Sequence, residues 1–285
     1  MESPIYMERV ERKFEVGICE SGVPALSRDL ARYVPLHEFM PGQQITLVSS
    51  VYFDNKEYHL LHYGLLSMDN HTRVRMRSYQ NAFQPPLPVL DYWMELKIKK
   101  EGKGKKKRFR VKSEDIPGFF GRKSNGAAEK VLHYNQMHGD TETIQEFYRE
   151  IRDAISWLGL KPMLLVTFKR IAFQREKERV SVDWDIEYRH IGPYFYRRPF
   201  WTEISKRPLG RENVVRLELK FPPGVSPPWM ADLQRRYPIW ERKYYSKFKE
   251  GMRFLLQGPL KHHKKADFFL EMLEAYREDW RSLVA

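Results

Sequence analysis

The stretch Tyr92–Lys112, YWMELKIKKEGKGKKKRFRVK, decides the fold of this chain. Its first half alternates between apolar and charged residues, as the two-residue period of a β-strand requires. The apolar set is Met94, Leu96 and Ile98, and the charged set is Glu95, Lys97 and Lys99. Gly102 and Gly104 allow a turn, after which Lys106–Lys112 returns as a second basic strand. The stretch therefore predicts a β-hairpin with one apolar face and one lysine-rich face.

The same design recurs in four other stretches of the chain. Their charged positions are Arg9, Glu11 and Lys13; Arg73, Arg75 and Arg77; Arg179, Asp183, Asp185 and Glu187; and Arg216, Glu218 and Lys220. One such strand is typical of a solvent-exposed sheet face. Five together favour either an open sheet with one charged face or a closed barrel with a charged interior and helices outside. A barrel of about eight strands can hold a small ligand.

Composition narrows the class of partner. The 285 residues carry a formal net charge of +13, and the pI is about 9.6. Such a charge favours a polyanion: nucleic acid, polyphosphate, nucleotide or anionic lipid. The lone Cys19 excludes an internal disulfide and fits a reducing compartment. Residues 1–15 do not resemble a signal peptide, and the apolar run Met163–Phe168 is too short to cross a bilayer, so we expect a soluble, cytoplasmic protein without a membrane span.

Helices alternate with these strands along the chain. Helical periodicity is clear over Val23–Tyr33, Thr141–Leu158, Ser246–Leu256 and the terminal segment Ala266–Val284. Strands followed by hairpins and separate helices predict an α+β fold dominated by antiparallel pairing.

The chemistry-bearing residues are mainly arginine and lysine beside a few carboxylates. The sequence contains no Walker-type loop, dinucleotide-binding glycine motif, H-E-x-x-H or G-x-S-x-G. A cationic field suits phosphoryl transfer, which needs cations on phosphate oxygens and a divalent metal. Arginine can form two parallel hydrogen bonds to one phosphate group, whereas lysine acts as a point charge. The carboxylates are either structural counter-ions or ligands of Mg²⁺ or Mn²⁺ that act together with phosphate oxygens.

An ordered set of short motifs then resembles one family. The motifs are Arg9-x-Glu11-x-Lys13, Ser50-Val51-Tyr52-Phe53-Asp54, Arg73-x-Arg75-x-Arg77-x-Tyr79, Glu95-x-Lys97, Phe168-x-Arg170-x-Ala172-Phe173, Arg179-x-Ser181-x-Asp183, Glu218-x-Lys220 and Ser246-Lys247-Phe248. Together they resemble the VTC domain, the catalytic domain of the vacuolar transporter chaperone polyphosphate polymerase, in the triphosphate tunnel metalloenzyme (CYTH-like) superfamily. The resemblance covers Tyr6–Leu256.

The resemblance implies an eight-stranded antiparallel barrel, the triphosphate tunnel, surrounded by helices. We expect the tunnel domain to span 1–258. The helical periodicity beyond the resemblance predicts a C-terminal helical extension at 259–285. The residues expected to act directly on the phosphates are Lys13, Arg75, Arg77, Lys97, Arg170 and Lys247. Further phosphate contacts are expected from Arg73, Lys99, Arg179 and Lys220, with Lys107 or Arg108 from the return strand of the hairpin. The metal would lie on Glu218, with Glu11 or Glu95 nearby.

One departure concerns a lysine that the family often places three residues before the Ser-Lys lysine. Here that position is Tyr244, and Lys243 lies one place away. The family's SPX domain and membrane helices have no counterpart in the sequence, which predicts a stand-alone version.

The resemblance implies a polyphosphate polymerase that moves the terminal phosphate of ATP onto a polyphosphate chain with Mn²⁺ or Mg²⁺. Two alternatives stay open: a hydrolase of triphosphate or polyphosphate on the same tunnel, and a non-catalytic polyanion-binding module. Nucleic-acid binding is disfavoured because Glu11, Glu95 and Glu218 interrupt the cationic faces and would repel a phosphate backbone. The oligomeric state stays open.

Overall fold

The computed structural model describes residues 10–39, 41–67, 69–82, 90–101, 103–121, 126–196 and 204–278. Arg9 and the end of the predicted terminal helix lie outside these ranges. The strands are β1 (Val10–Val16), β2 (Leu36–His37), β3 (Thr46–Asp54), β4 (His71–Asn81), β5 (Asp91–Lys100), β6 (Lys103–Lys112), β7 (Lys161–Arg175), β8 (Glu178–His190), β9 (Gly210–Glu212), β10 (Val215–Phe221) and β11 (Ile239–Glu241). The helices are α1 (Val23–Ala31), α2 (His59–Leu66), α3 (Ile116–Phe120), α4 (Ala127–Asn135), α5 (Thr141–Trp157), α6 (Trp229–Arg236), α7 (Lys247–Gln257) and α8 (Ala266–Glu278).

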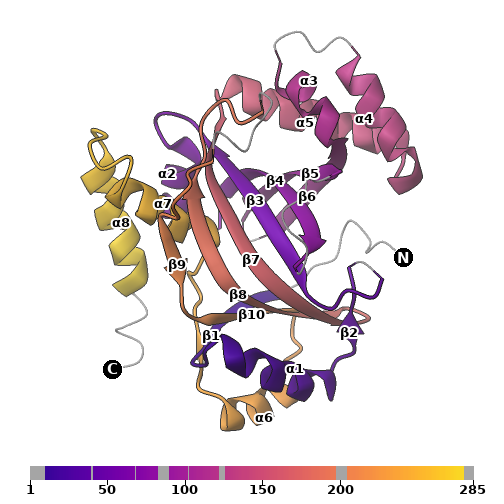
Figure 1. Ribbon diagram of the computed structural model, residues 1–285, viewed down its shortest axis with the longest axis vertical. Helices are drawn as coiled ribbons and strands as arrows, with labels where there is room; N and C mark the ends of the chain where they lie inside the picture. Colours follow the sequence, from indigo (N-terminus) through magenta and orange to yellow (C-terminus); the bar gives the residue numbers. More distant parts are fainter. Residues whose placement is uncertain are drawn as a thin grey trace.

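The centre of the molecule is one curved antiparallel sheet (Figure 1). Its eleven strands follow the order β11-β1-β10-β8-β7-β3-β4-β5-β6, with β2 added to β7 and β9 to β8. The predicted α+β class and antiparallel pairing are confirmed. The predicted eight-stranded closure is not seen, because no backbone pairing joins β6 to β11 or β1 among the described strands. The two ends of the sheet instead approach through side chains: Glu11 of β1 lies 3.7 Å from the Nζ of Lys97 on β5.

The predicted hairpin is formed by β5 and β6. Glu95 pairs with Arg108 and Lys97 pairs with Lys106, so these four side chains share one face. The turn passes through Glu101, whose φ is 51°.

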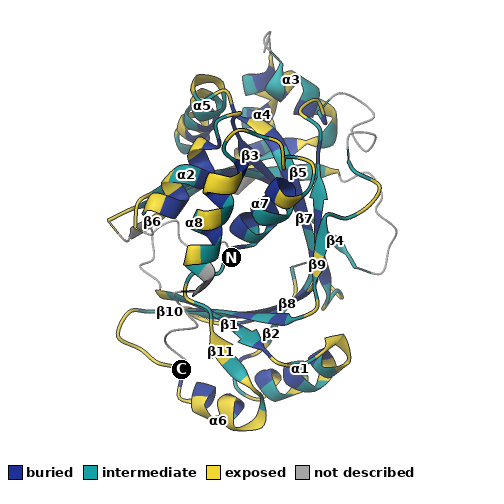
Figure 2. Cartoon of the chain, turned by 90° about the vertical axis from the view of Figure 1, so that its left-hand side faces the viewer, coloured by how far each residue is buried: buried dark blue, intermediate teal, exposed yellow. Residues whose placement is uncertain are grey.

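Helices cover the convex face of the sheet in two groups. Helices α3, α4 and α5, at the top of Figure 1, pack on the apolar residues of β4, β5 and β6. Helices α1 and α6, at the bottom, pack on those of β1, β8 and β10. In Figure 2 the strands between these two groups of helices carry mostly buried and intermediate residues, and most exposed residues lie on the helices and loops.

Helix α7 lies on the concave side with α2 and α8. Val48, Val166 and Phe168 face it and share a third core with Met252 of α7 and Phe269 of α8. Gly251 makes the approach possible, because a Cβ there would meet the Leu164 side chain at 2.3 Å. The rest of the concave face stays open beside α7.

Candidate phosphate-binding cavity

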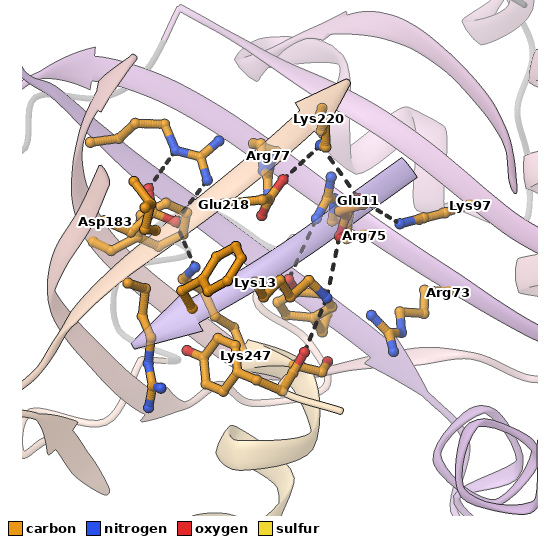
Figure 3. A pocket seen from close by; sticks show the side chains of 18 residues that line it. Glu11, Lys13, Arg73, Arg75, Arg77, Lys97, Asp183, Glu218, Lys220 and Lys247 are labelled. Atoms are coloured by element: carbon orange, nitrogen blue, oxygen red, sulfur yellow. Dashed lines mark hydrogen bonds and ion pairs between the residues drawn. The ribbon is translucent and has the colours of Figure 1, made fainter. Parts of the chain in front are cut away.

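A cavity occupies the concave face between the curved sheet and the beginning of α7 (Figure 3). Its walls carry nine cationic side chains and three carboxylates. The cations are Lys13, Arg73, Arg75, Arg77, Lys97, Arg170, Arg216, Lys220 and Lys247, and the carboxylates are Glu11, Asp183 and Glu218. Alternation places all but one of them there, since each lies on the inward face of its strand while its apolar neighbours face the helices. The exception is Lys247, which is the first residue of α7.

Asp183 of β8 holds two of the cations in place. Its carboxylate accepts hydrogen bonds from Nε and Nη2 of Arg170 at 2.6 and 2.7 Å and from Nζ of Lys247 at 2.6 Å. Asp183 is 1% exposed. Burial raises the pKa of Asp183, but Arg170 and Lys247 outweigh burial and lower it, so the group stays ionised. The two cations are thereby fixed before any ligand arrives.

Glu95 acts in the same way for a second pair of cations. Its buried carboxylate contacts Nε of Arg75 and Nζ of Lys106. Burial raises the pKa of Glu95, but Arg75 and Lys106 lower it well below its usual range. Because both neighbours are cations and Glu95 does not line the cavity, its role is that of a counter-ion rather than the expected metal ligand.

Glu11 and Glu218 form a separate carboxylate pair at the cavity wall. Lys220 joins them, with its Nζ 2.7 Å from Glu218 and 3.6 Å from Glu11. Burial and Glu218 raise the pKa of Glu11, but Lys220, Lys97 and Lys13 lower it overall. Burial raises the pKa of Glu218, but Lys220, Arg170, Lys13 and Lys247 together lower it well below its usual range. Both groups are therefore anionic oxygen donors, the ligand type that Mg²⁺ and Mn²⁺ take together with phosphate oxygens.

No cluster of three or more acidic, histidine or cysteine side chains suited to a metal occurs in the described part of the chain. The pair Glu11 and Glu218 thus fits a metal only if a ligand completes the coordination. About one or two protein carboxylates are common when Mg²⁺ bridges substrate phosphates.

Arg73 and Arg77 differ from the other arginines of the cavity. Arg77 donates from Nε to Ser50 Oγ at 2.9 Å, and Arg73 lies over the Phe248 ring at 6.0 Å. Neither has a carboxylate within ion-pair distance among the described residues. Their guanidinium groups are therefore available to fork a phosphate.

The family follows from a comparison with known protein families. The model described as the VTC domain matches residues 8–256. The chain belongs to the VTC domain family. Over 222 residues it is 27% identical to vacuolar transporter chaperone complex subunit 4 of Trypanosoma brucei brucei, which covers 72% of this chain and 28% of that protein. Subunit 2 of Saccharomyces cerevisiae is 26% identical over 166 residues, covering 54% of this chain and 20% of that protein. The chain thus spans less than a third of the length of these relatives.

Most residues expected from the VTC resemblance meet in the cavity, and five do not line it: Glu95, already described, and Lys99, Lys107, Arg108 and Arg179. The cavity is lined by all six residues that were expected to act directly on the phosphates. Arg73, Lys220, Glu11 and Glu218 line it as well. Lys99 instead pairs with Asp69 at 2.9 Å, and the guanidinium of Arg108 lies 4.3 Å from the Trp93 ring centroid. The guanidinium of Arg179 lies 4.9 Å from the Phe39 ring centroid.

Lys107 lies on the wrong face for a phosphate ligand. It is buried against α5, where its Nζ contacts Glu146 at 2.9 Å and also Glu150. Lys107 shares the outward face of β6 with Phe109 and Val111, which are fully buried under the helices. The inward face of the return strand instead carries Lys106 and Arg108. The sequence reasoning included Arg108 but missed Lys106, although this parity predicts it.

Asp185 and Glu187 also leave the expected face. The β7–β8 register shifts between Thr167 and Lys169, and Asp185 has a φ of 52°. Such a bulge reverses the alternation. Asp185 therefore pairs with Lys169 and Glu187 with Arg189 and Arg211, away from the cavity.

Several lining residues of the VTC domain had not been assigned to the site from the sequence. These are Tyr52, Phe168, Asp183, Arg216, Tyr245 and Ser246. Tyr52 and Asp183 occur within the family motifs and have inward parity. Arg216 is less available to bind a phosphate than its position suggests, because its guanidinium forms ion pairs with both Glu15 and Glu212.

No helix in the described ranges is both long and apolar enough to span a membrane.

Proposed function

We propose that the cavity binds a chain of phosphates and acts as a metal-dependent polyphosphate polymerase, moving the terminal phosphate of ATP onto a polyphosphate end. One observation carries the proposal: nine cations face three carboxylates in one partly enclosed space. Like charges held together at reduced dielectric repel one another, and a polyanion relieves that repulsion. Membership of the VTC domain family supports the same substrate class.

The cations of the cavity fall into two groups according to their contacts. Arg77 and Arg73 are free to fork phosphate oxygens, while Arg170 and Lys247 are held by Asp183 at fixed positions. Positioning of this kind is the main contribution that proteins make to phosphoryl transfer. Glu218 and Glu11 would hold Mn²⁺ or Mg²⁺, which neutralises charge developing on the transferred phosphoryl group.

A hydrolase would use the same clamp with water as the acceptor, and a passive binding module would use it without chemistry. The ionised pair Glu11 and Glu218 favours chemistry over passive binding. Two carboxylates in a phosphate site weaken anion binding unless a cation lies between them and the ligand.

The test compares ligands on wild type, Arg77→Ala and Arg77→Lys by calorimetry. We expect ATP and inorganic tripolyphosphate to bind wild type, and Arg77→Ala to lose about ten- to hundredfold in affinity for both. Arg77→Lys should recover only part of the loss, because lysine keeps the charge but not the fork. The proposal would be refuted if Arg77→Ala bound tripolyphosphate as tightly as wild type but no longer bound single-stranded nucleic acid.

A further inference from the structure

A second basic group extends from Arg73, on the cavity wall, to the place where β4 begins and α7 packs on the sheet. It consists of His71, Arg73 and Lys249. His71 and Arg73 are two residues apart on β4, so their side chains share the concave face about 7 Å apart. Lys249 comes from the first turn of α7, next to Phe248, whose ring lies 6.0 Å from the Arg73 guanidinium.

The charge of Arg73 affects the pKa of both His71 and Lys249. Burial first, then the charges of Arg73 and Lys13, lower the pKa of Lys249 to about 7. Burial first, then the nearby cations, among them Arg73 and Lys249, lower the pKa of His71 to about 4. His71 and Lys249 therefore both lie within the positive field of Arg73.

None of the three has a carboxylate within ion-pair distance in the described part of the chain. Lys249 is only 9% exposed, and its ammonium group rests on the ring of Tyr276, 3.4 Å from the centroid. The Nδ1 atom of His71 is buried without a hydrogen-bond partner. Arg73 has the Phe248 contact and no carboxylate. By contrast, Arg170 and Lys247 are compensated by Asp183, and Arg75 is compensated by Glu95.

An uncompensated buried cation and an orphaned ring nitrogen both cost free energy. An anionic oxygen bound between them would supply the missing partner for each donor. Arg73 connects this place with the central cavity, because it lies one inward position along β4 from Arg75.

We propose that His71, Arg73 and Lys249 form a second anion subsite, which holds a phosphate of a polyphosphate chain beyond the triphosphate held by the central residues. This proposal rests on the proposed function. The chain would pass Arg77 and Arg75, reach Arg73, and end against Lys249 beneath α8. Tyr276 covers Lys249 from α8, which lies beyond the part of the chain that the VTC model matches.

The experiment compares long-chain polyphosphate with inorganic tripolyphosphate on wild type and Lys249→Met by calorimetry. Methionine keeps the length and the contact with the Tyr276 ring but removes the charge. We expect the affinity for the long chain to fall about tenfold while that for tripolyphosphate stays unchanged. Lys249→Arg should retain long-chain binding. The matched control is Lys243→Met, which removes an exposed lysine outside the cavity and should change neither affinity.

His71→Asn provides a second variant if Lys249→Met fails to fold, and should lower long-chain affinity about threefold. The subsite would be refuted if the folded variants had the same ratio of long-chain to tripolyphosphate affinity as wild type. An equal loss for both ligands would also refute it, because the residues would then belong to the triphosphate site. Failure of wild type to bind tripolyphosphate would instead refute the proposed function.

Discussion

At the scale of single residues, the two central arginines of β4 are not equivalent. Arg75 compensates the buried Glu95, whereas Arg77 bonds to a neutral hydroxyl. Both arginines were predicted from alternation in the sequence. Their different partners were not, because the inward carboxylates of neighbouring strands can pair with several cations, and only the register decides which.

We therefore expect Arg75→Ala and Arg77→Ala to lower catalytic efficiency alike, by about ten- to hundredfold. Only Arg75→Ala should also destabilise the fold, by about 2–3 kcal/mol, because Glu95 is 1% exposed and loses one of its two cations. Urea unfolding of the two variants measures the difference. Equal stability would contradict the counter-ion role of Glu95.

Glu218 is expected to act through the metal rather than in binding. Glu218→Gln should leave nucleotide affinity within a few-fold and reduce turnover by at least about a hundredfold, since the metal acts mainly on the transition state. Turnover with Mn²⁺ and calorimetry without it separate the two effects. Full activity in Glu218→Gln would remove the metal role from this residue.

Lys97 should make phosphate binding depend on pH. Glu11 raises its pKa, but burial, Lys220, Lys13 and Arg73 lower the pKa of Lys97 to about 8 overall. The side chain carries its charge below that pH and loses it above, so tripolyphosphate affinity should fall by roughly tenfold as pH rises from about 7 to 9. In Lys97→Arg the decline should be much smaller, because arginine stays protonated. Superimposable pH profiles of the two proteins would contradict the assignment.

At the scale of elements, strand β6 separates neighbouring lysines onto opposite faces. Lys106 reaches Glu95 inside, and Lys107 reaches α5 outside. The sequence predicted the hairpin. The inward lysine could have been identified from Phe109 and Val111, because these apolar residues mark the outward face of β6, which Lys107 shares. The bulge at Asp185 could not be predicted in this way, because no glycine or proline marks it in β8.

Replacing each lysine should separate the two roles. Lys106→Met should impair phosphate turnover, because it removes an inward charge beside Arg75 and Arg108. Lys107→Met should leave turnover unchanged and lower stability by about 1–3 kcal/mol through its contacts with α5. Activity and thermal unfolding of both variants test this, and the opposite pattern would show that the register is wrong.

Helix α8 packs on the domain rather than standing apart. Phe269 is 1% exposed within the concave core, while its neighbour Phe268 is 48% exposed. Phe269→Ala should cost about 3–5 kcal/mol, and the matched control Phe268→Ala less than about 1 kcal/mol. Equal effects in denaturant unfolding would mean that α8 does not dock as described.

At the scale of the whole molecule, one curved sheet turns separate charged faces into a common cavity. Its class and antiparallel pairing followed from the alternation of residues such as Met94 and Lys97. The open edges of the sheet could not be predicted from this alternation. Closure depends on whether the edge strands β6 and β11 form hydrogen bonds with each other, and these strands are far apart in the sequence. Side-chain pairs such as Glu11 with Lys97 bring the edges together instead.

The central claim is that this cavity transfers phosphate to phosphate. The most direct measurement is gel analysis of products after incubation with ATP labelled at its terminal phosphate, Mn²⁺ and a short polyphosphate primer. We predict a ladder of labelled polyphosphate that lengthens with time, is absent in Glu218→Gln and is strongly reduced in Arg77→Ala. Release of labelled inorganic phosphate without any ladder would contradict the polymerase and identify a hydrolase, and no turnover of ATP would contradict both.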